Sequence, residues 1–172
     1  VLGPQDDEFS DSGIASLLNS TYTVSDQSNR QGLRLDGPVI ESKSGRYDIV
    51  SDAVVNGSIQ VPGDGKPIIL LADRQTTGGY AKIATVATVD LPRLGQAGPG
   101  TKITFSAITI EESQELLAVR SERFNPKNLV SIVEKISLKV DGDDIVVGVA
   151  DNGSSALAAV EGNTYPVSVE EY

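Results

Sequence analysis

Cysteine, histidine, methionine and tryptophan are all absent from this 172-residue chain, and two of these absences remove whole classes of function. Without cysteine there are no disulfides, thiolate nucleophiles or cysteine-bound metals. Without histidine, the Ser-His-Asp triad, the imidazole general base and the usual zinc sites are excluded, so we expect no metal site. Acid–base chemistry must therefore come from Asp, Glu, Lys, Tyr or an activated Ser or Thr.

Long apolar runs and basic clusters are missing as well. No run approaches the ~20 apolar residues that a membrane-spanning helix needs, and the acidic N-terminal segment lacks a signal-peptide pattern, so we expect no membrane association. The formal net charge is −10, and its acidic excess lies at the two ends of the chain. No basic stripe interleaved with aromatic residues is present, so nucleic acid is not expected as a partner. The lack of cysteine fits a cytoplasmic location, and the missing initiator methionine predicts a fragment or a processed product.

Short apolar stretches separated by Gly and Pro turns indicate a mostly β domain, a closed β-barrel or a sandwich. We expect one or two short helices. The clearest is 110–119, with acidic residues at its N-terminal end, and another over 7–18 would use Asp11 or Ser12 as its N-cap. Residues 91–96 predict one short helical turn. The expected strands are 22–24, 32–35, 48–51, 59–61, 68–72, 83–89 and 102–105.

The character of the chain changes after residue 123. Residues 124–172 combine alternating β-branched stretches with Asp-Gly and Asn-Gly turns, which predicts a β-rich C-terminal extension. We expect its strands to join the barrel edge or a partner chain. Residues 160–169 resemble the connector that often precedes a biotin-carrier domain, although an ordinary hairpin is the favoured interpretation and no carrier sequence is present.

The most informative stretch is 57–80. An apolar run at 68–72 predicts a buried strand and ends in Asp73-Arg74-Gln75-Thr76-Thr77-Gly78-Gly79-Tyr80. That block places a carboxylate, a guanidinium, an amide, hydroxyls and a phenol at one strand end, and its two glycines predict an anion-holding nest of N–H groups. Lys82 could lie on the same face. The simpler interpretation is a strand followed by a Gly-Gly turn.

Three segments carry a family resemblance: SNRQGLRLDGP at 28–38, GSIQVPGDGKPIILLADRQTTGGY at 57–80 and TVDLPRLGQAGPG at 88–100. In this order, and over roughly Gly3 to Leu117, they resemble the C-terminal half of the allophanate hydrolase subunit 2 family. That family includes the carboxyltransferase part of urea carboxylase, the C subunit of bacterial 5-oxoprolinase and an antagonist of a sporulation-kinase inhibitor. One departure is Gln31, where family members usually carry Met.

The resemblance implies a cyclophilin-like closed β-barrel over 1–123, acting as a carboxyltransferase lobe. It also implies partners: an N-terminal lobe of the same family, a homologous subunit 1, and a biotin carboxylase or carrier. No cofactor would be bound covalently, and carboxybiotin would arrive on a partner carrier. The substrate stays open among urea, 5-oxoproline and another amide. Two alternatives are a regulatory antagonist of a subunit-1-like histidine-kinase inhibitor, and a binding module that has lost its chemistry.

Carboxyl transfer to an amide nitrogen requires a group that binds a planar carboxylate, a group that stabilises an oxyanion, and a proton acceptor. Arg30, Gln60 and Asp73 are the candidate catalytic residues. For Arg30 and Arg34, a plain surface or ion-pair role is the competing interpretation. We expect the candidates to converge on one open cleft. The candidate substrate-binding residues are Asn29, Arg34, Arg74, Gln75, Thr76, Thr77, Gly78, Gly79 and Tyr80.

Overall fold

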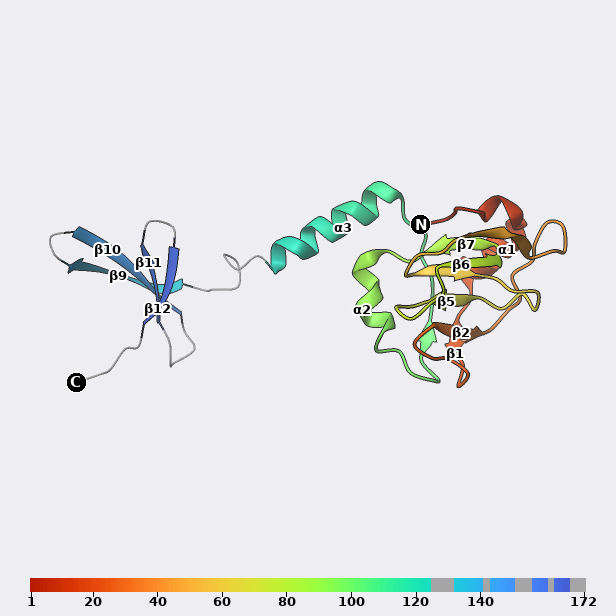
Figure 1. Ribbon diagram of the computed structural model, residues 1–172, viewed down its shortest axis with the longest axis horizontal. Helices are drawn as coiled ribbons and strands as arrows, with labels where there is room; N and C mark the ends of the chain where they lie inside the picture. The colour runs from red at the N-terminus through yellow and green to blue at the C-terminus, as the bar shows by residue number, and fades with distance from the viewer. Residues whose placement is uncertain (125–131, 141–142, 151–155, 161–162, 168–172) are drawn as a thin grey trace. The chain divides into compact units, whose positions relative to one another are not determined.

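The computed structural model describes residues 1–124, 132–140, 143–150, 156–160 and 163–167 (Figure 1). The chain divides into two compact units, Val1–Ala118 and Val119–Tyr172. The boundary falls inside the helix α3, Ile110–Arg123. Both units are dominated by antiparallel strands, so the expectation of a mostly β protein with few helices is confirmed.

A six-stranded antiparallel sheet forms the body of the first unit, in the order β7-β4-β5-β2-β1-β8. A separate two-stranded ribbon pairs β3 with β6. The strands lie close to their expected positions, although β8 has only two residues. Their bounds are β1 Tyr22–Val24, β2 Gly32–Asp36, β3 Asp48–Ala53, β4 Ser58–Gln60, β5 Ile68–Leu70, β6 Thr77–Tyr80, β7 Lys82–Thr85 and β8 Lys102–Ile103.

The closed barrel expected from the family resemblance is not found in the described part of the chain. The sheet begins at β7 and ends at β8, and these two edge strands are not paired. The N-terminal segment covers the β7 edge instead. The backbone N–H groups of Gly3 and Gln5 donate to the carbonyls of Ile83 and Lys82 at 3.0 and 3.1 Å. The hydrogen-bonding groups of this edge are therefore satisfied without closure of the sheet.

One hydrophobic core lies under the six-stranded sheet. Phe9, Tyr22, Ile40 and Ile69 are fully buried there. The Tyr22 ring meets Phe105 edge-on at 6.0 Å between centroids, and its hydroxyl donates to the carbonyl of Ser16 at 3.3 Å. The packing therefore fixes the segment after β8 although it forms no further ladder.

The helix α1, Asp11–Asn19, begins one or two residues before the start that an N-cap at Asp11 or Ser12 implies. Its N-cap is Ser10, whose Oγ accepts from the Gly13 N–H at 3.0 Å, and neither Asp11 nor Ser12 takes that position. The Ser12 hydroxyl is committed elsewhere, because it donates to the Glu41 carboxylate at 2.8 Å. A short 3₁₀ helix, η1 Asp6–Glu8, precedes α1.

The expected strand over 83–89 is wrong in its second half. β7 ends at Thr85, and the chain then turns through η2, Thr88–Asp90, into the short helix α2, Leu91–Leu94. Pro92 lies in the first turn of α2, where its fixed φ suits a helix start, so it favours helix over continued strand.

The helix α3 confirms the expectation for 110–119 and extends beyond it. Thr109 starts it with a capping box: the Glu112 N–H donates to the Thr109 hydroxyl at 3.1 Å, and the Thr109 N–H donates to the Glu112 carboxylate at 2.7 Å. In the described part of the chain, no helix combines the length and apolar character needed to cross a membrane.

The second unit holds a four-stranded antiparallel sheet in the order β12-β11-β10-β9. The β11–β12 pairing, with Val160 opposite Asn163, is that of a hairpin. The break at 125–126 and the turns at 141–142 and 151–155 lie outside the described residues. That these strands extend the barrel edge or reach a partner stays a prediction. Their bounds are β9 Ile132–Val140, β10 Asp143–Ala150, β11 Ala156–Val160 and β12 Asn163–Val167.

Gly13→Ala should destabilise the first unit although alanine is the better helix former. A Cβ at position 13 would meet the backbone carbonyl oxygen of Glu41, which cannot move aside as a side chain can. We expect a loss of about 1–3 kcal/mol in the free energy of unfolding, measured by urea titration. Gly98→Ala is the control, because a Cβ there meets open space. Equal or higher stability for Gly13→Ala would contradict this packing.

Candidate functional site

A cluster of polar side chains lies between the β4–β7 edge of the sheet and the β3–β6 ribbon. Two members come from adjacent sheet strands, where Gln60 is the register partner of Lys82. The others come from the N-terminal segment, from β3 and from the turn before β6. We call this set the polar cluster, and its members are Gln5, Asp52, Gln60, Gln75 and Lys82.

Gln60 is 2% exposed, so it faces the protein interior and not an open cleft. Its Nε2 donates to the carbonyl of Tyr80 at 3.2 Å, and its Oε1 accepts from Gln75 Nε2 at 3.4 Å. A Cβ at Gly78 would lie 2.5 Å from Gln60 Nε2. The buried carboxamide therefore occupies the space that a side chain at position 78 would fill.

Lys82 is a buried cation with a matched partner. Its side chain is 2% exposed, and its ammonium lies 2.9 Å from Asp52 Oδ2, on a carboxylate that is 50% exposed. Gln5 connects both residues, because its Nε2 donates to Asp52 at 3.1 Å and its Oε1 accepts the Lys82 backbone N–H at 3.1 Å. The charge on Lys82 is thus compensated where solvent does not reach it.

Asp52 is held ionised by its neighbours. The hydrogen bond from Lys82 is the largest influence, and the Ala53 N–H and the Gln5 amide also donate to the carboxylate. Together they lower the pKa of Asp52 below its ordinary value of 3.8. At neutral pH this group is therefore a fixed negative charge that accepts hydrogen bonds.

Arg30 and Asp73, the two other candidate catalytic residues, meet each other. Arg30 Nε lies 3.0 Å from Asp73 Oδ2, with the side chains 88% and 46% exposed. Backbone bonds support the pair: the Asp73 N–H donates to the Arg30 carbonyl at 3.1 Å, and the Leu71 N–H donates to the Gln31 carbonyl at 2.9 Å. The side-chain carbonyl of Asn29 closes the turn by accepting the Gln31 N–H at 2.8 Å.

The 73–80 block is partly strand, which the turn interpretation missed. Gly78 and Gly79 lie within β6, opposite β3, so the anion-holding nest expected there does not form. Thr77 is the register partner of Ala53, and the Thr76 carbonyl accepts the Val54 N–H at 3.1 Å.

The other candidate residues fall into separate surroundings. The Arg74 guanidinium donates to the carbonyls of Val54 and Leu71, both at 3.4 Å, which fixes the chain between β5 and β6. Tyr80 is 41% exposed. Arg34 is exposed on β2 and lines a pocket of about 220 Å³ together with Asp36 and Lys66. The structure thus brings Arg30 to Asp73 and Gln60 to Gln75, and a ligand common to both pairs stays a prediction.

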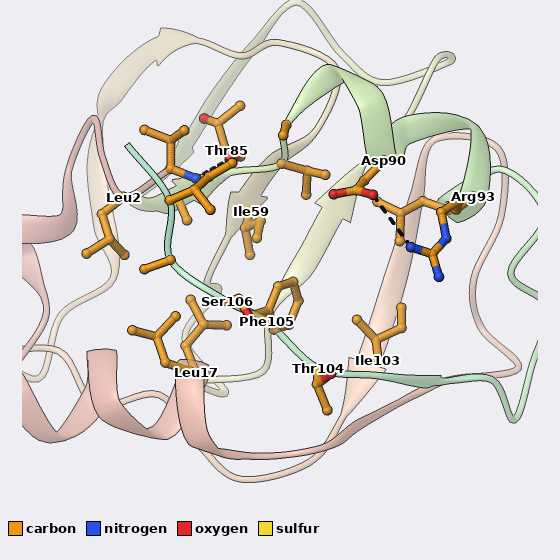
Figure 2. Close-up of a pocket in the computed structure, with 18 of the residues that line it drawn as sticks. Leu2, Leu17, Ile59, Thr85, Asp90, Arg93, Ile103, Thr104, Phe105 and Ser106 are labelled. Carbon is orange, nitrogen blue, oxygen red and sulfur yellow. Dashed lines mark hydrogen bonds and ion pairs between the residues drawn. The ribbon is translucent and has the colours of Figure 1, made fainter. Parts of the chain in front are cut away.

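A separate pocket of about 490 Å³ opens beside β4 and β7 (Figure 2). Its apolar walls include Leu2, Leu17, Ile59 and Phe105, with the Asp90–Arg93 ion pair at one side. Since successive residues of a strand point to opposite faces, Ile59 lines this pocket while Gln60 points to the polar cluster. The pocket suits apolar groups, whereas the chemistry of carboxyl transfer requires the polar residues.

Asp52, Gln5 and Lys82 complete the cluster, and the sequence-based site residues did not include them. Lys82 had one usable signal, since a lysine between Ala81 and Ile83 in an apolar strand requires a charged partner. Asp52 lies thirty residues before Lys82, and the sequence around Asp52 does not mark it as the partner of that lysine. Within the described residues, no group of three or more acidic side chains is placed to hold a metal ion.

Gly78→Ala should displace the Gln60 carboxamide and cost about 1–3 kcal/mol of unfolding free energy. If the clash is the cause, the same change in a Gln60→Ala background should cost clearly less, and a double-mutant cycle by urea denaturation measures the difference. Gly79→Ala is the control, because its Cβ would meet nothing closer than 3.7 Å. Additive effects of Gly78→Ala and Gln60→Ala would contradict the proposed contact.

Asp52→Asn should weaken the acid dependence of stability. A lowered pKa in the folded state means that the unfolded chain binds the proton first. The stabilisation is therefore present above about pH 4 and is lost as the pH falls through the folded-state pKa. Thermal unfolding from pH 7 to pH 3 measures this loss of stability at low pH. Asp48→Asn, on the same strand, is the control and should lose stability as the wild type does. A wild-type loss of stability in Asp52→Asn would refute the assignment.

Comparison with known proteins places these features in a family. The C subunit of 5-oxoprolinase from Haemophilus influenzae is 44% identical over 95 residues, which cover 55% of this chain and 30% of that protein. The Escherichia coli protein of the same name is 37% identical over 111 residues, covering 64% of this chain and 36% of that protein. The chain thus spans about a third of the length of these curated relatives.

A solved structure extends the likeness in fold. The urea amidolyase of K. lactis superposes with a TM-score of 0.68 at 22% identity, covering 92% of this chain and 11% of that protein. Residues 1–107 match the family model described as carboxyltransferase domain, subdomain A and B. The chain therefore belongs to this family of carboxyltransferase domains.

Proposed function

We propose that this chain supplies part of a site that transfers a carboxyl group to the nitrogen of a small amide or urea, acting beside other chains. The Arg30–Asp73 pair is the observation that carries the proposal. It joins the turn before β2, which carries Arg30, to the end of β5, which Asp73 follows, and both positions lie in segments that carry the family resemblance.

Arg30 suits the task of holding a planar carboxylate. Its Nε lies 3.0 Å from Asp73 Oδ2, so one edge of the guanidinium faces that carboxylate. The side chain is 88% exposed. The two terminal nitrogens of the guanidinium form a second edge, which does not include Nε. That edge can donate two parallel hydrogen bonds to a carboxylate, a geometry that lysine cannot provide.

Neighbouring groups fit the second task, the stabilisation of an oxyanion. The carboxamide of Gln75 and the hydroxyl of Thr76 are exposed hydrogen-bonding groups beside Asp73, suited to an amide substrate or to a developing oxyanion. Carboxybiotin, brought by a partner carrier, would supply the carboxyl group. Arg30 would hold that group while the accepting nitrogen attacks it; the bond from the carboxyl carbon to the biotin nitrogen breaks, and the proton lost by the accepting nitrogen returns to that biotin nitrogen. The chain would then contribute mainly by positioning.

The proposed partners follow from the coverage of the relatives. A chain that spans about a third of the 5-oxoprolinase C subunit leaves room for a further lobe of the same family. The names of those relatives describe them as subunits, which supports a multi-chain assembly. We propose that a subunit 1 and a carrier complete the site, that the complex works in the cytoplasm, and that its substrate is urea, 5-oxoproline or a related amide.

Arg30→Lys should lower carboxyl transfer by the reconstituted complex about ten- to a hundredfold, because a charge-assisted hydrogen bond contributes about 1.5–3 kcal/mol. The measurement is ATP- and bicarbonate-dependent turnover with candidate amides, with the fold checked by thermal melting. Arg93→Lys is a matched control: Arg93 is 86% exposed and also faces an aspartate, at 3.8 Å. Near-wild-type turnover for Arg30→Lys would make Arg30 structural and favour a regulatory antagonist over an enzyme.

A further inference from the structure

We propose that the pocket beside β2 and β5 is a second ligand site, and that it binds a small zwitterion of the α-amino-acid type. Arg34 would bind the carboxylate of this ligand, and Asp26 would bind its ammonium group. Both residues line the same pocket of about 220 Å³. The proposal goes beyond carboxyl transfer and does not depend on the Arg30–Asp73 pair.

The wall of the pocket that carries Asp26 is fixed to the strand that carries Arg34. The Ser25 N–H donates to the Arg34 carbonyl at 2.9 Å, and the Arg34 N–H donates to the Ser28 hydroxyl at 3.0 Å. The Ser28 N–H also closes the turn onto the Ser25 carbonyl at 3.2 Å. The backbone around both charged residues is therefore held in place before any ligand arrives, which lowers the entropic cost of binding.

Three of the five charged side chains that line the pocket are engaged with one another. Lys66 Nζ lies 2.8 Å from Asp36 Oδ1, and this hydrogen bond lowers the pKa of Asp36 and raises the pKa of Lys66. Asp64 Oδ1 accepts the Lys66 backbone N–H at 3.1 Å. The Leu35 N–H donates to the Pro67 carbonyl at 3.0 Å, so this second wall is attached to β2 as well.

Arg34 and Asp26 are the two remaining charged side chains of the pocket, and neither has a charged partner. In the described part of the chain, no hydrogen bond or ion pair involves the Arg34 guanidinium, and the two residues form no ion pair with each other. The Asp26 carboxylate accepts from the neighbouring Ser25 hydroxyl at 3.4 Å. The pocket thus presents a guanidinium and a carboxylate that can both take a ligand.

A zwitterion is the ligand that satisfies both groups. A guanidinium donates two parallel hydrogen bonds to a carboxylate, and an ammonium group donates to a carboxylate such as that of Asp26. The lining holds two cations and three carboxylates, a formal charge of −1, which opposes a plain anion. A plain cation is opposed by Arg34. The volume is smaller than that of pockets for drug-sized ligands, so a molecule of few heavy atoms fits.

The test is an NMR titration of the full 172-residue chain, labelled with ¹⁵N, with three probes of similar shape at pH 7 and low salt. L-Alanine carries both charges, propionate lacks the ammonium group, and ethylammonium lacks the carboxylate. We expect L-alanine to shift the backbone amide signals of Gln27 and Leu35, and to bind roughly tenfold or more tightly than either analogue, because each loses a charge-assisted contact. Equal affinity for propionate or ethylammonium, or no shift at Gln27 and Leu35 with L-alanine, would overturn the proposal.

Variants locate the two contacts. Arg34→Gln and Asp26→Asn should each weaken L-alanine binding roughly tenfold or more, since each removes one charged partner. Both side chains are exposed, so neither change removes a core contact. Arg93→Gln is the control: it removes an exposed arginine that lies outside this pocket, and it should bind as the wild type does. Wild-type affinity in Arg34→Gln, or an equal loss in Arg93→Gln, would refute the assignment.

A further variant separates this site from the proposed carboxyl transfer. Arg30→Lys should retain the wild-type affinity for L-alanine, because Arg30 does not line the pocket. Loss of L-alanine binding in Arg30→Lys would contradict a separate site. Retained L-alanine binding in a chain that supports no carboxyl transfer would leave this proposal intact while the proposed function fails.

Discussion

The buried ammonium of Lys82 is the constraint on which the arrangement of the first unit depends. An unpaired charge in a sheet strand carries a desolvation cost of several kcal/mol, so a carboxylate has to reach it. That carboxylate comes from Asp52, in a ribbon that is not hydrogen-bonded into the same sheet. This ion pair joins the ribbon to the sheet together with the hydrogen bond from Gln60 to the Tyr80 carbonyl, and Gln5 connects the N-terminal segment to both.

The close approach of the ribbon decides the chemistry of its other residues. Where β6 passes over β4, a glycine is required, because the Gln60 carboxamide fills the space. Gln60 in turn holds Gln75, and the chain between β5 and β6 also carries Asp73 to Arg30. A buried polar layer and an exposed ion pair are thus connected through one short segment. The packing thus explains why the residues of this segment are of these types.

Local signals predicted the local structure well. The short apolar stretches at 22–24 and 32–35 and the acidic start of α3 led to correct elements, because neighbouring residues carry the information. Pairing between distant segments was less accessible. The Gly78-Gly79 pair has the composition of a turn, yet pairing with β3 makes it a strand, since tertiary contacts override a local preference. The open edge of the sheet likewise depends on the N-terminal segment bonding to β7, about eighty residues away.

In the candidate site too, residue types could be predicted from the local sequence, whereas contacts between distant residues could not. The residue types at 30 and 73 indicated their chemistry, and the structure adds that they neutralise each other. Gln60 was identified by its polarity within an apolar strand, but that pattern could not show whether it faces solvent or the interior. The pairing of Asp52 with Lys82 spans thirty residues and two separate β structures, so no local pattern could reveal it.

The three-residue strand β4 has a consequence for how this domain can change over evolution. It separates an apolar pocket from a polar layer, with Ile59 on one side and Gln60 on the other. Sliding the strand by one position would exchange the two, exposing a carboxamide to hydrocarbon and a hydrocarbon to a buried charge. The turn after β4 opposes such a shift in register, because the Gly65 N–H donates to the Pro62 carbonyl at 2.9 Å. We therefore expect insertions and deletions to accumulate elsewhere, while the spacing from β4 to β5 stays constant among functional descendants.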